Sequence, residues 1–259
     1  TAAASHALAS QPETASSLGR YAFNKCTSLK SVTLGRGITV IDSNTFSGCV
    51  ALRKVEMQGA IAEINAYAFS DCNSLTSFTV PESVTDVNRS AFADCSRLKD
   101  ILNKSSLSLS FSGGINVITD SAESKITTDA NGYVFYYSGQ FDYKYSLIDY
   151  VGASTYLNSL PQNYNGEKYK IDSYAFAFND KLKSITFPST AEKIDATSLY
   201  RSSGLETIEV EAGNINYRAS GNCLIKINGT GMTNGDALVI GCKNSTIPAD
   251  ASLDSIGYM

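Results

Sequence analysis

The chain has 259 residues, a net charge of −4 and a hydrophobic content of 43%, which is enough apolar material for a core and excludes disorder for most of its length. The pI is near 5.1, so nothing in the charge balance favours a nucleic acid or an acidic membrane surface as partner. No apolar run approaches the length that crosses a bilayer, and we expect no membrane insertion within this segment.

Residues 1–17 are rich in Ala and Ser and predict a flexible tail. From residue 18 to residue 102, a single pattern recurs every 23 residues. A fixed period in this range predicts a solenoid, in which each repeat buries its apolar residues against its neighbours. The recurring positions hold Phe23, Phe46, Phe69 and Phe92, then Cys26, Cys49, Cys72 and Cys95, then Leu29, Leu52, Leu75 and Leu98.

Each repeat contains two short extended pieces and two turns. The first piece, Leu29 to Leu34, alternates apolar and polar residues as a strand does. A turn at Gly35 and Gly37 leads to a second piece, Ile38 to Ile41. The segment around Phe23 has the +3 and +6 apolar spacing of one helical or 3₁₀ turn. We therefore predict a β-rich solenoid with a parallel strand ladder on one wall and short turns on the opposite wall.

The cysteines are predicted to be reduced core residues rather than a disulfide framework. Four of the six occupy the same repeat position, where a small thiol packs against its copies. The same position later holds Asn179 and Ser202, which cannot form disulfides. Cys223 and Cys242 lie outside this series, and a bond between them stays open.

The period stops after Leu102, and residues 103–166 predict an irregular all-β spacer. Strand-like pieces cover 133–137 and 145–151, and Asp129 to Gly132 forms a turn before the first of them. The repeats resume over 167–212. Residues 213–259 predict a second spacer and the start of a further repeat, and we expect the natural chain to continue beyond Met259 because a solenoid that stops in mid-coil exposes its core.

The repeat motif resembles that of the BspA-like leucine-rich repeat proteins of bacterial surfaces. The residues that carry the resemblance are Tyr21, Ala22, Phe23, Cys26, Leu29, Val32 and Leu34 with their copies, and Pro81 and Pro188 at strand ends. The resemblance implies a right-handed α/β leucine-rich repeat fold, a secreted or cell-surface location, and adhesion to host or neighbouring-cell proteins. It implies no catalytic residues and no cofactor. The sequence departs from the general leucine-rich pattern at Gly37, Ala60 and Ser83, where Asn or Cys is usual, so other contacts must hold the turn.

Residues that could support catalysis or metal binding are sparse. The only histidine, His6, lies in the tail, and one cysteine per 23 residues does not fit a zinc site. Asp142 and Asp149 are the best pair of carboxylates for glycosidase chemistry, although solvated acids beside a strand are the favoured interpretation. The run from Asn228 to Gly231 is predicted to be a turn, because it lacks the Lys and the strand-loop-helix setting of a phosphate loop.

Two surfaces are candidates for binding a protein, or a glycan. The first, the ladder stripe, consists of outward positions on the predicted strands. These residues could equally be ordinary solvated side chains. They are Lys30, Ser31, Thr33, Arg53, Lys54, Glu56, Thr76, Ser77, Thr79 and Lys99, with Asp100 beside them. The second, the aromatic patch, could bind a partner or form a local core of the spacer: Tyr136, Tyr137, Phe141, Tyr143 and Tyr145.

The favoured function is a non-catalytic extracellular module that binds protein in adhesion. A structural stalk that spaces another domain from the cell surface is the main alternative, and a carbohydrate-active enzyme is a remote one. A binder should carry a coherent patch of one sign or of apolar residues, whereas a stalk should have evenly mixed polar faces.

Overall fold

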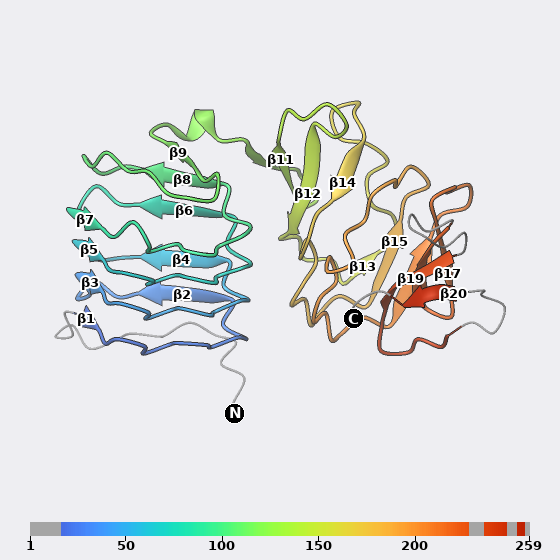
Figure 1. The fold of residues 1–259 in the computed structure, drawn as a ribbon, viewed down its shortest axis with the longest axis horizontal. Helices are drawn as coiled ribbons and strands as arrows, with labels where there is room; N and C mark the ends of the chain where they lie inside the picture. The colour runs from blue at the N-terminus through green and yellow to red at the C-terminus, as the bar shows by residue number, and fades with distance from the viewer. Residues whose placement is uncertain (1–16, 228–235, 248–252, 257–259) are drawn as a thin grey trace. The chain divides into compact units, whose positions relative to one another are not determined.

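The computed structural model describes residues 17–227, 236–247 and 253–256, and the chain divides into two compact units between Ser124 and Lys125. Both units consist of strands and turns (Figure 1), and the single helix of the described residues is a 3₁₀ turn, η1 (Ser121–Glu123). No helix in this part of the chain is long enough to cross a membrane. His6, Asn228 to Gly231 and most of the predicted tail lie outside the described residues.

Unit 1 contains the predicted parallel ladder and a second parallel ladder made from the shorter extended pieces. The longer strands form one wall: β2 (Ser31–Leu34) with β4 (Lys54–Met57), and β6 (Ser77–Val80) with β8 (Asp100–Asn103) and β9 (Asn116–Ile118). The shorter strands form a second sheet: β1 (Ser17–Leu18), β3 (Val40–Ile41), β5 (Glu63–Ile64) and β7 (Asp86–Val87). Val32 pairs with Val55 and Ile41 with Ile64, so each residue lies beside its copy one coil later.

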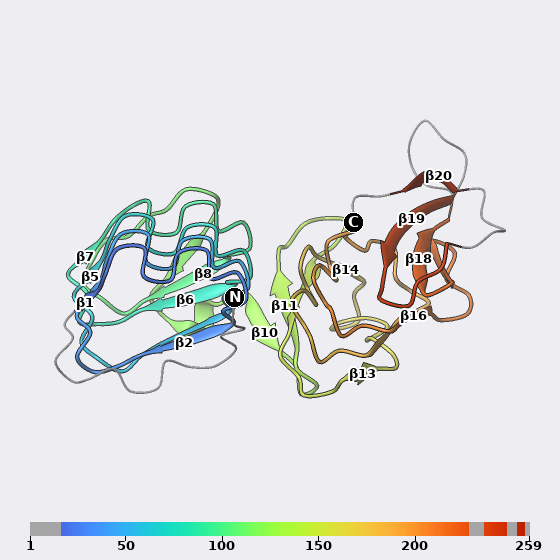
Figure 2. The same ribbon diagram turned by 90° about the horizontal axis from the view of Figure 1, so that it is seen from below.

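A column of phenylalanine rings forms the centre of unit 1. Viewed from below, the coils follow nearly the same path (Figure 2), so copies of one residue stack. The centroids of the Phe23 and Phe46 rings are 5.3 Å apart with an interplanar angle of 7°. Phe46 and Phe69 repeat this at 5.3 Å, and Phe69 and Phe92 at 5.6 Å. Phe46 and Phe69 are fully buried, which makes the column the core of the stack.

The wall opposite the longer strands is not helical, so the predicted helical or 3₁₀ turn is wrong. Two residues before Phe23 and two after it, Tyr21 and Lys25 have φ angles of 60° and 57°. A left-handed residue interrupts a right-handed helix, so the segment forms successive tight turns instead. Its amides bond to the next coil: Phe23 N donates to Thr45 O at 2.8 Å, and Lys25 N donates to Ser47 O at 2.7 Å. These bonds between coils hold the turn wall together.

The cysteine position contributes a hydrogen bond as well as packing. The thiol of Cys49 donates to the carbonyl of Phe23 at 3.1 Å, and Cys95 donates to the carbonyl of Phe69 at 2.9 Å. In unit 2 the hydroxyl of Ser202 makes the same bond to Phe176 at 2.7 Å. Burial raises the pKa of the Cys49 thiol to about 12. All six cysteines are free thiols, so Cys223 and Cys242 are not bonded to each other.

The end of unit 1 extends beyond the last sequence repeat. β9 pairs in parallel with β8, and the side chains of Leu107, Leu109 and Phe111 pack against the core although they form no strand. The boundary between the compact units therefore falls after Ser124, whereas the sequence pattern placed the start of the spacer at residue 103.

Unit 2 begins with an antiparallel meander and then resumes the solenoid. β10 (Ile126–Thr128), β11 (Tyr133–Tyr137) and β12 (Tyr145–Tyr150) are antiparallel, and β14 (Tyr169–Ile171) runs parallel to β12. The predicted turn joins β10 to β11, where Asp129 Oδ1 accepts bonds from Asn131 N and Tyr133 N, both at 2.9 Å. The resumed repeats form a parallel sheet: β13 (Tyr156–Leu157), β15 (Ser184–Phe187) and β16 (Thr207–Val210).

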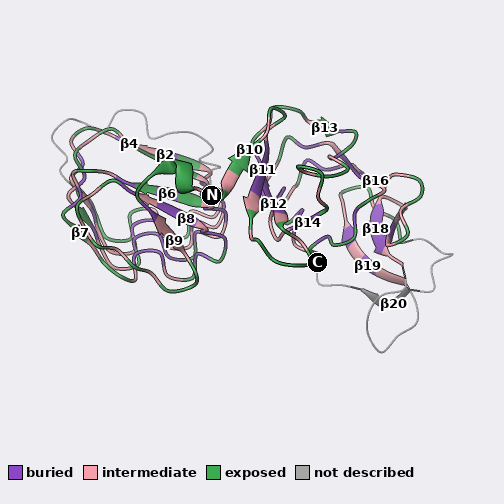
Figure 3. Ribbon diagram, turned by 90° about the horizontal axis from the view of Figure 1, so that it is seen from above, coloured by how far each residue is buried: buried purple, intermediate pink, exposed green. Residues whose placement is uncertain are grey.

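The last sheet of unit 2 is formed by the second predicted spacer. β17 (Tyr217–Ser220), β18 (Cys223–Lys226) and β19 (Asp236–Gly241) are antiparallel, and β20 (Leu253–Ile256) runs parallel to β19. Tyr133 and Phe135 of the meander share one core cluster with Phe176 of the repeats and Leu224 of β18. β11 and β12 are accordingly largely buried (Figure 3), which makes the meander an integral part of unit 2.

Candidate binding surfaces

The ladder stripe lies on the longer strands of unit 1 and on the residue that precedes each of them. Ser31, Lys54, Glu56, Ser77 and Thr79 are exposed. The other members are partly buried: Lys30, Thr33, Arg53, Thr76 and Lys99. β2 and β4 belong to one sheet and β6 and β8 to another, so the stripe runs over two sheets.

Part of the stripe is occupied by contacts between its own members. Glu56 accepts a hydrogen bond from the Thr33 hydroxyl at 3.2 Å and forms an ion pair with Lys54 at 2.5 Å. These bonds to Lys54 and Thr33 lower the pKa of Glu56. Unit 2 repeats the first contact, with Thr186 donating to Glu209 at 3.2 Å. Side chains at these positions therefore connect adjacent coils.

Asp100 does not face outward as predicted. It is 2% exposed, and its carboxylate accepts bonds from Ser124 Oγ at 2.7 Å and from Asn116 Nδ2 at 3.2 Å. The cause is β9, which covers the edge of β8 with a strand that the repeat pattern does not contain. Asp100 thus anchors the end of unit 1.

The aromatic patch divides into a ring cluster and an exposed tip. Tyr137 and Tyr145 have ring centroids 5.3 Å apart, and Tyr164 lies edge-on to Tyr145 at 5.0 Å. Tyr136 is half-buried on β11 and is not part of this ring cluster, whereas Phe141 is completely exposed on the loop between β11 and β12. Tyr164 belongs to this cluster although no pattern in the sequence indicated it.

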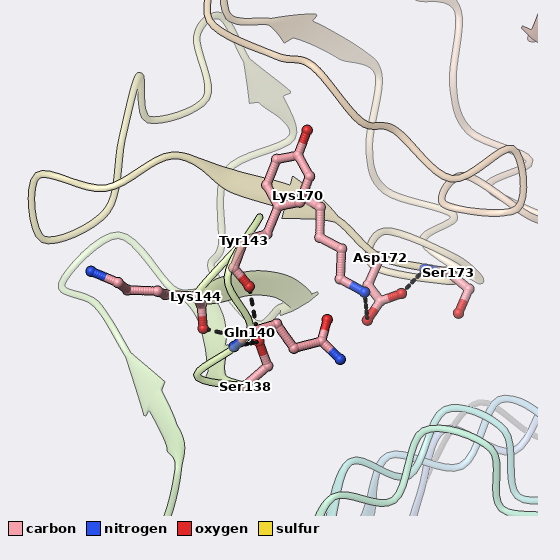
Figure 4. Close-up of polar contacts among 7 residues, drawn as sticks. All are labelled: Ser138, Gln140, Tyr143, Lys144, Lys170, Asp172 and Ser173. Atoms are coloured by element: carbon pink, nitrogen blue, oxygen red, sulfur yellow. Dashed lines mark hydrogen bonds and ion pairs between the residues drawn. The ribbon is translucent and has the colours of Figure 1, made fainter. Parts of the chain in front are cut away.

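The loop that carries Phe141 and Tyr143 is closed by Ser138. The Ser138 hydroxyl donates to the carbonyl of Tyr143 at 2.9 Å, and Gln140 N donates to Ser138 Oγ at 3.2 Å. The Tyr143 ring extends away from Ser138 (Figure 4). The Tyr143 hydroxyl donates to Glu192 at 3.0 Å. Burial, followed by this bond, raises the pKa of Tyr143 to about 12. Tyr143 is therefore held against the repeats and is a structural contact.

Asp142 and Asp149 are not arranged as a glycosidase pair. Asp149 is 3% exposed on β12, which corrects the prediction that it is solvated, and its Oδ1 accepts a bond from Tyr150 N at 2.8 Å. Asp142 lies on the exposed loop before β12. Asp149 is thus buried and bonded to the backbone, whereas glycosidase chemistry needs two carboxylates that both face the substrate.

The structure adds a cleft of about 610 Å³ in unit 2, which sequence reasoning missed. Its lining combines tyrosines with amide side chains: Tyr133, Tyr150, Tyr156, Asn131, Asn158 and Gln162. None of the side chains that line it is charged. The three tyrosines stood out in the sequence, but nothing there connects them to amides from the β10–β11 turn and from the segment after β13.

No cluster of three or more His, Cys, Asp or Glu residues that could hold a metal ion occurs in the described ranges.

Comparisons with known proteins agree with this picture. The family model of the BspA type leucine rich repeat region, in six copies, matches residues 7–120 and 153–230. It leaves out 121–152, which contains the meander β10, β11 and β12. No curated protein matches the chain.

Several solved structures are similar to the chain at low sequence identity. A leucine-rich cell surface protein from Faecalibacterium prausnitzii is 22% identical over 77% of this chain and 55% of that one, with a TM-score of 0.32. A leucine-rich repeat protein from Bacteroides ovatus is 19% identical over 77% of this chain and 54% of that one, with a TM-score of 0.34. The pneumococcal vaccine antigen PcpA is 20% identical over 70% of this chain and 39% of that one, with a TM-score of 0.30.

The chain thus spans about half the length of the first of these proteins. The family model, by contrast, matches well over half of the chain itself, and the matched segments contain the stacked phenylalanines and the parallel ladders. The chain belongs to the BspA-type leucine-rich repeat family.

Proposed function

We propose that the chain is a non-catalytic protein-binding module of a bacterial surface or secreted protein, and that unit 1 binds its partner on the ladder stripe. The observation that carries the proposal is the recurrence of cations at one coil position. Lys30, Arg53 and Lys99 occupy copies of the same position, with Thr76 between them. Lys54 adds a further cation beside Arg53, against the single carboxylate of Glu56.

The opposite sign occurs on the shorter ladder. Glu63 on β5 and Asp86 on β7 are neighbours in register and are both exposed. The exposed acids Glu63 and Asp86 thus lie on a different sheet from the recurring cations, whereas a simple spacer needs no such arrangement. A stacked solenoid holds these charges on a rigid frame, which suits a partner with an acidic surface.

The test measures attachment of the labelled chain to epithelial cells and to other bacterial cells by flow cytometry. We expect the variant Lys30→Ser/Arg53→Ser/Lys99→Ser to lose attachment at least about five-fold, because complementary charges accelerate association. The matched control, Glu63→Ser/Asp86→Ser, neutralises the other ladder and should attach like the wild type. Equal urea midpoints would establish that all three proteins are folded.

Four results separate the alternatives. Treating the cells with protease should abolish attachment if the partner is a protein, and raising the salt concentration should weaken it. If the triple variant attaches like the wild type, the binding site does not lie on the ladder stripe. A wild-type chain that attaches to no cell would instead favour the structural stalk.

One observation favours the stalk as the second candidate. Glu56 already bonds to Thr33 and Lys54, and Thr186 bonds to Glu209 in the same way. These outward side chains strengthen the contact between coils, and a purely structural spacer requires no more than this from its surface. A spacer does not require a cation to recur at the position of Lys30, Arg53 and Lys99, and for this reason we place binding first.

A further inference from the structure

We propose that the cleft in unit 2 is a binding site for a neutral saccharide. The cleft is separate from the ladder stripe, and its ligand class follows from its lining. It opens beside the β10–β11 turn and the segment that follows β12. Its volume of about 610 Å³ lies within the usual range for small-ligand sites.

Three tyrosines supply the apolar faces of the cleft. The rings of Tyr133 and Tyr150 are 5.2 Å apart and inclined at 41°. Tyr156, on the short strand β13, is 60% exposed. The negative face of an aromatic ring attracts the polarised C–H groups that a sugar presents on one side of its ring. The exposed ring of Tyr156 is therefore the expected stacking platform.

Tyr133 adds a phenol hydroxyl to the cleft. The residue is 6% exposed and belongs to the lining. A phenol in this position gains free energy from a partner that both accepts and donates, as a sugar hydroxyl does. Burial raises the pKa of Tyr133 to about 12, so the hydroxyl stays protonated at neutral pH.

Two amides supply adaptable polar contacts. The side chains of Asn131 and Asn158 line the cleft and bond to no other side chain or carbonyl in the described ranges. Each offers two donors and one acceptor oxygen. The backbone of Asn131 is fixed, because its N–H donates to Asp129 at 2.9 Å. A Cβ on Gly152 would lie 2.5 Å from the Asn131 carbonyl, so only glycine permits this close approach.

The charge around the cleft selects a neutral ligand. No lining side chain is charged. Directly behind the lining, Glu211 accepts hydrogen bonds from Ser159 at 2.6 Å and from the amide of Gln162. These bonds lower the pKa of Glu211, so a negative charge persists there and repels a sialic acid, a uronic acid or a sulfate group. Rings, uncharged amides and a nearby carboxylate together fit a sugar without acidic groups.

The experiment applies the full chain to an array of oligosaccharides. The array carries neutral glucose, galactose, mannose and N-acetylhexosamine oligosaccharides together with their sialylated and sulfated forms. Neutral sugars should be retained and their acidic forms should not. The retained sugar is then titrated by calorimetry against Tyr156→Ala and Asn131→Ala/Asn158→Ala, and each variant should bind at least about ten-fold more weakly. Tyr156→Phe keeps the ring and should bind within about two-fold of the wild type.

Two controls assign the result to the cleft. Phe141→Ala removes a ring that is even more exposed than Tyr156 but lies outside the cleft, and this variant should bind normally. The Lys30→Ser/Arg53→Ser/Lys99→Ser variant should also bind normally, so the outcome is independent of the function proposed for unit 1. The inference is overturned if no neutral sugar binds at millimolar concentration, if only acidic sugars bind, or if the cleft variants bind like the wild type.

Discussion

Replacing Phe46 with Ala tests whether the stacked phenylalanines hold unit 1 together. Phe46 is fully buried and lies between Phe23 and Phe69, with both centroid distances at 5.3 Å. Removing a buried phenylalanine costs about 3 to 5 kcal/mol through lost transfer free energy and the cavity left behind. A double-mutant cycle between Phe46 and Phe69 measures the stacking of one such pair of rings, and it should give a coupling free energy of about 0.5 to 1.5 kcal/mol.

The assay is urea denaturation followed by far-UV circular dichroism, because the chain contains no tryptophan. Phe141→Ala is the matched control, since this ring is completely exposed and its loss should change the unfolding free energy by less than about 0.5 kcal/mol. The reasoning fails if Phe46→Ala costs less than about 1 kcal/mol, or if the cycle with Phe69 gives no coupling. Either result would mean that the coils do not depend on the column.

Three further predictions concern the cysteine position and one glycine. Burial raises the pKa of Cys49 to about 12 from an ordinary value near 9. The folded state therefore keeps the thiol proton at a pH where the unfolded chain has lost it. The unfolding free energy should be unaffected by ionisation of Cys49 below about pH 9 and should fall by about 1.4 kcal/mol per pH unit between about pH 9 and 12. Cys49→Ser keeps a donor for the Phe23 carbonyl and should remove this alkaline loss, measured as the difference in urea midpoints at about pH 8 and 10.5. Cys72 and Cys95 are buried and should react with Ellman's reagent only after denaturation, so rapid reaction of the native protein would contradict the burial. Gly132→Ala should destabilise unit 2 by about 1 to 3 kcal/mol. Gly132 has a φ of +88°, and a Cβ at this position would lie 2.4 Å from the backbone nitrogen of residue 152. An unchanged melting temperature would refute this prediction.

Much of the fold follows from the spacing of a few residues. A period of 23 places Phe46 beside Phe69 and Val32 beside Val55, and both contacts are observed. The turn wall was not predictable in the same way, because Tyr21 adopts a φ of 60° that its side chain does not signal. Bonds from the next coil hold it there, and such bonds belong to the assembled stack rather than to any local pattern.

The candidate surfaces were predictable only where they follow the repeat. The ladder stripe is periodic, so its outward residues could be named, apart from Asp100, which an additional strand covers. The contact of Tyr143 with Glu192 joins residues 49 positions apart and depends on how the meander packs. The cleft depends likewise on the close approach of residues 132 and 152, which no spacing rule anticipates.

The thiols of the turn wall have a consequence for chemical durability. Thiolate, not thiol, is the form that is oxidised and that exchanges with disulfides. Cys49 is fully buried, its pKa is raised to about 12, and its proton is directed at the Phe23 carbonyl. A buried thiol of this kind should resist oxidation and disulfide exchange in an oxidising compartment. The stack therefore needs no reductant to keep these cysteines reduced.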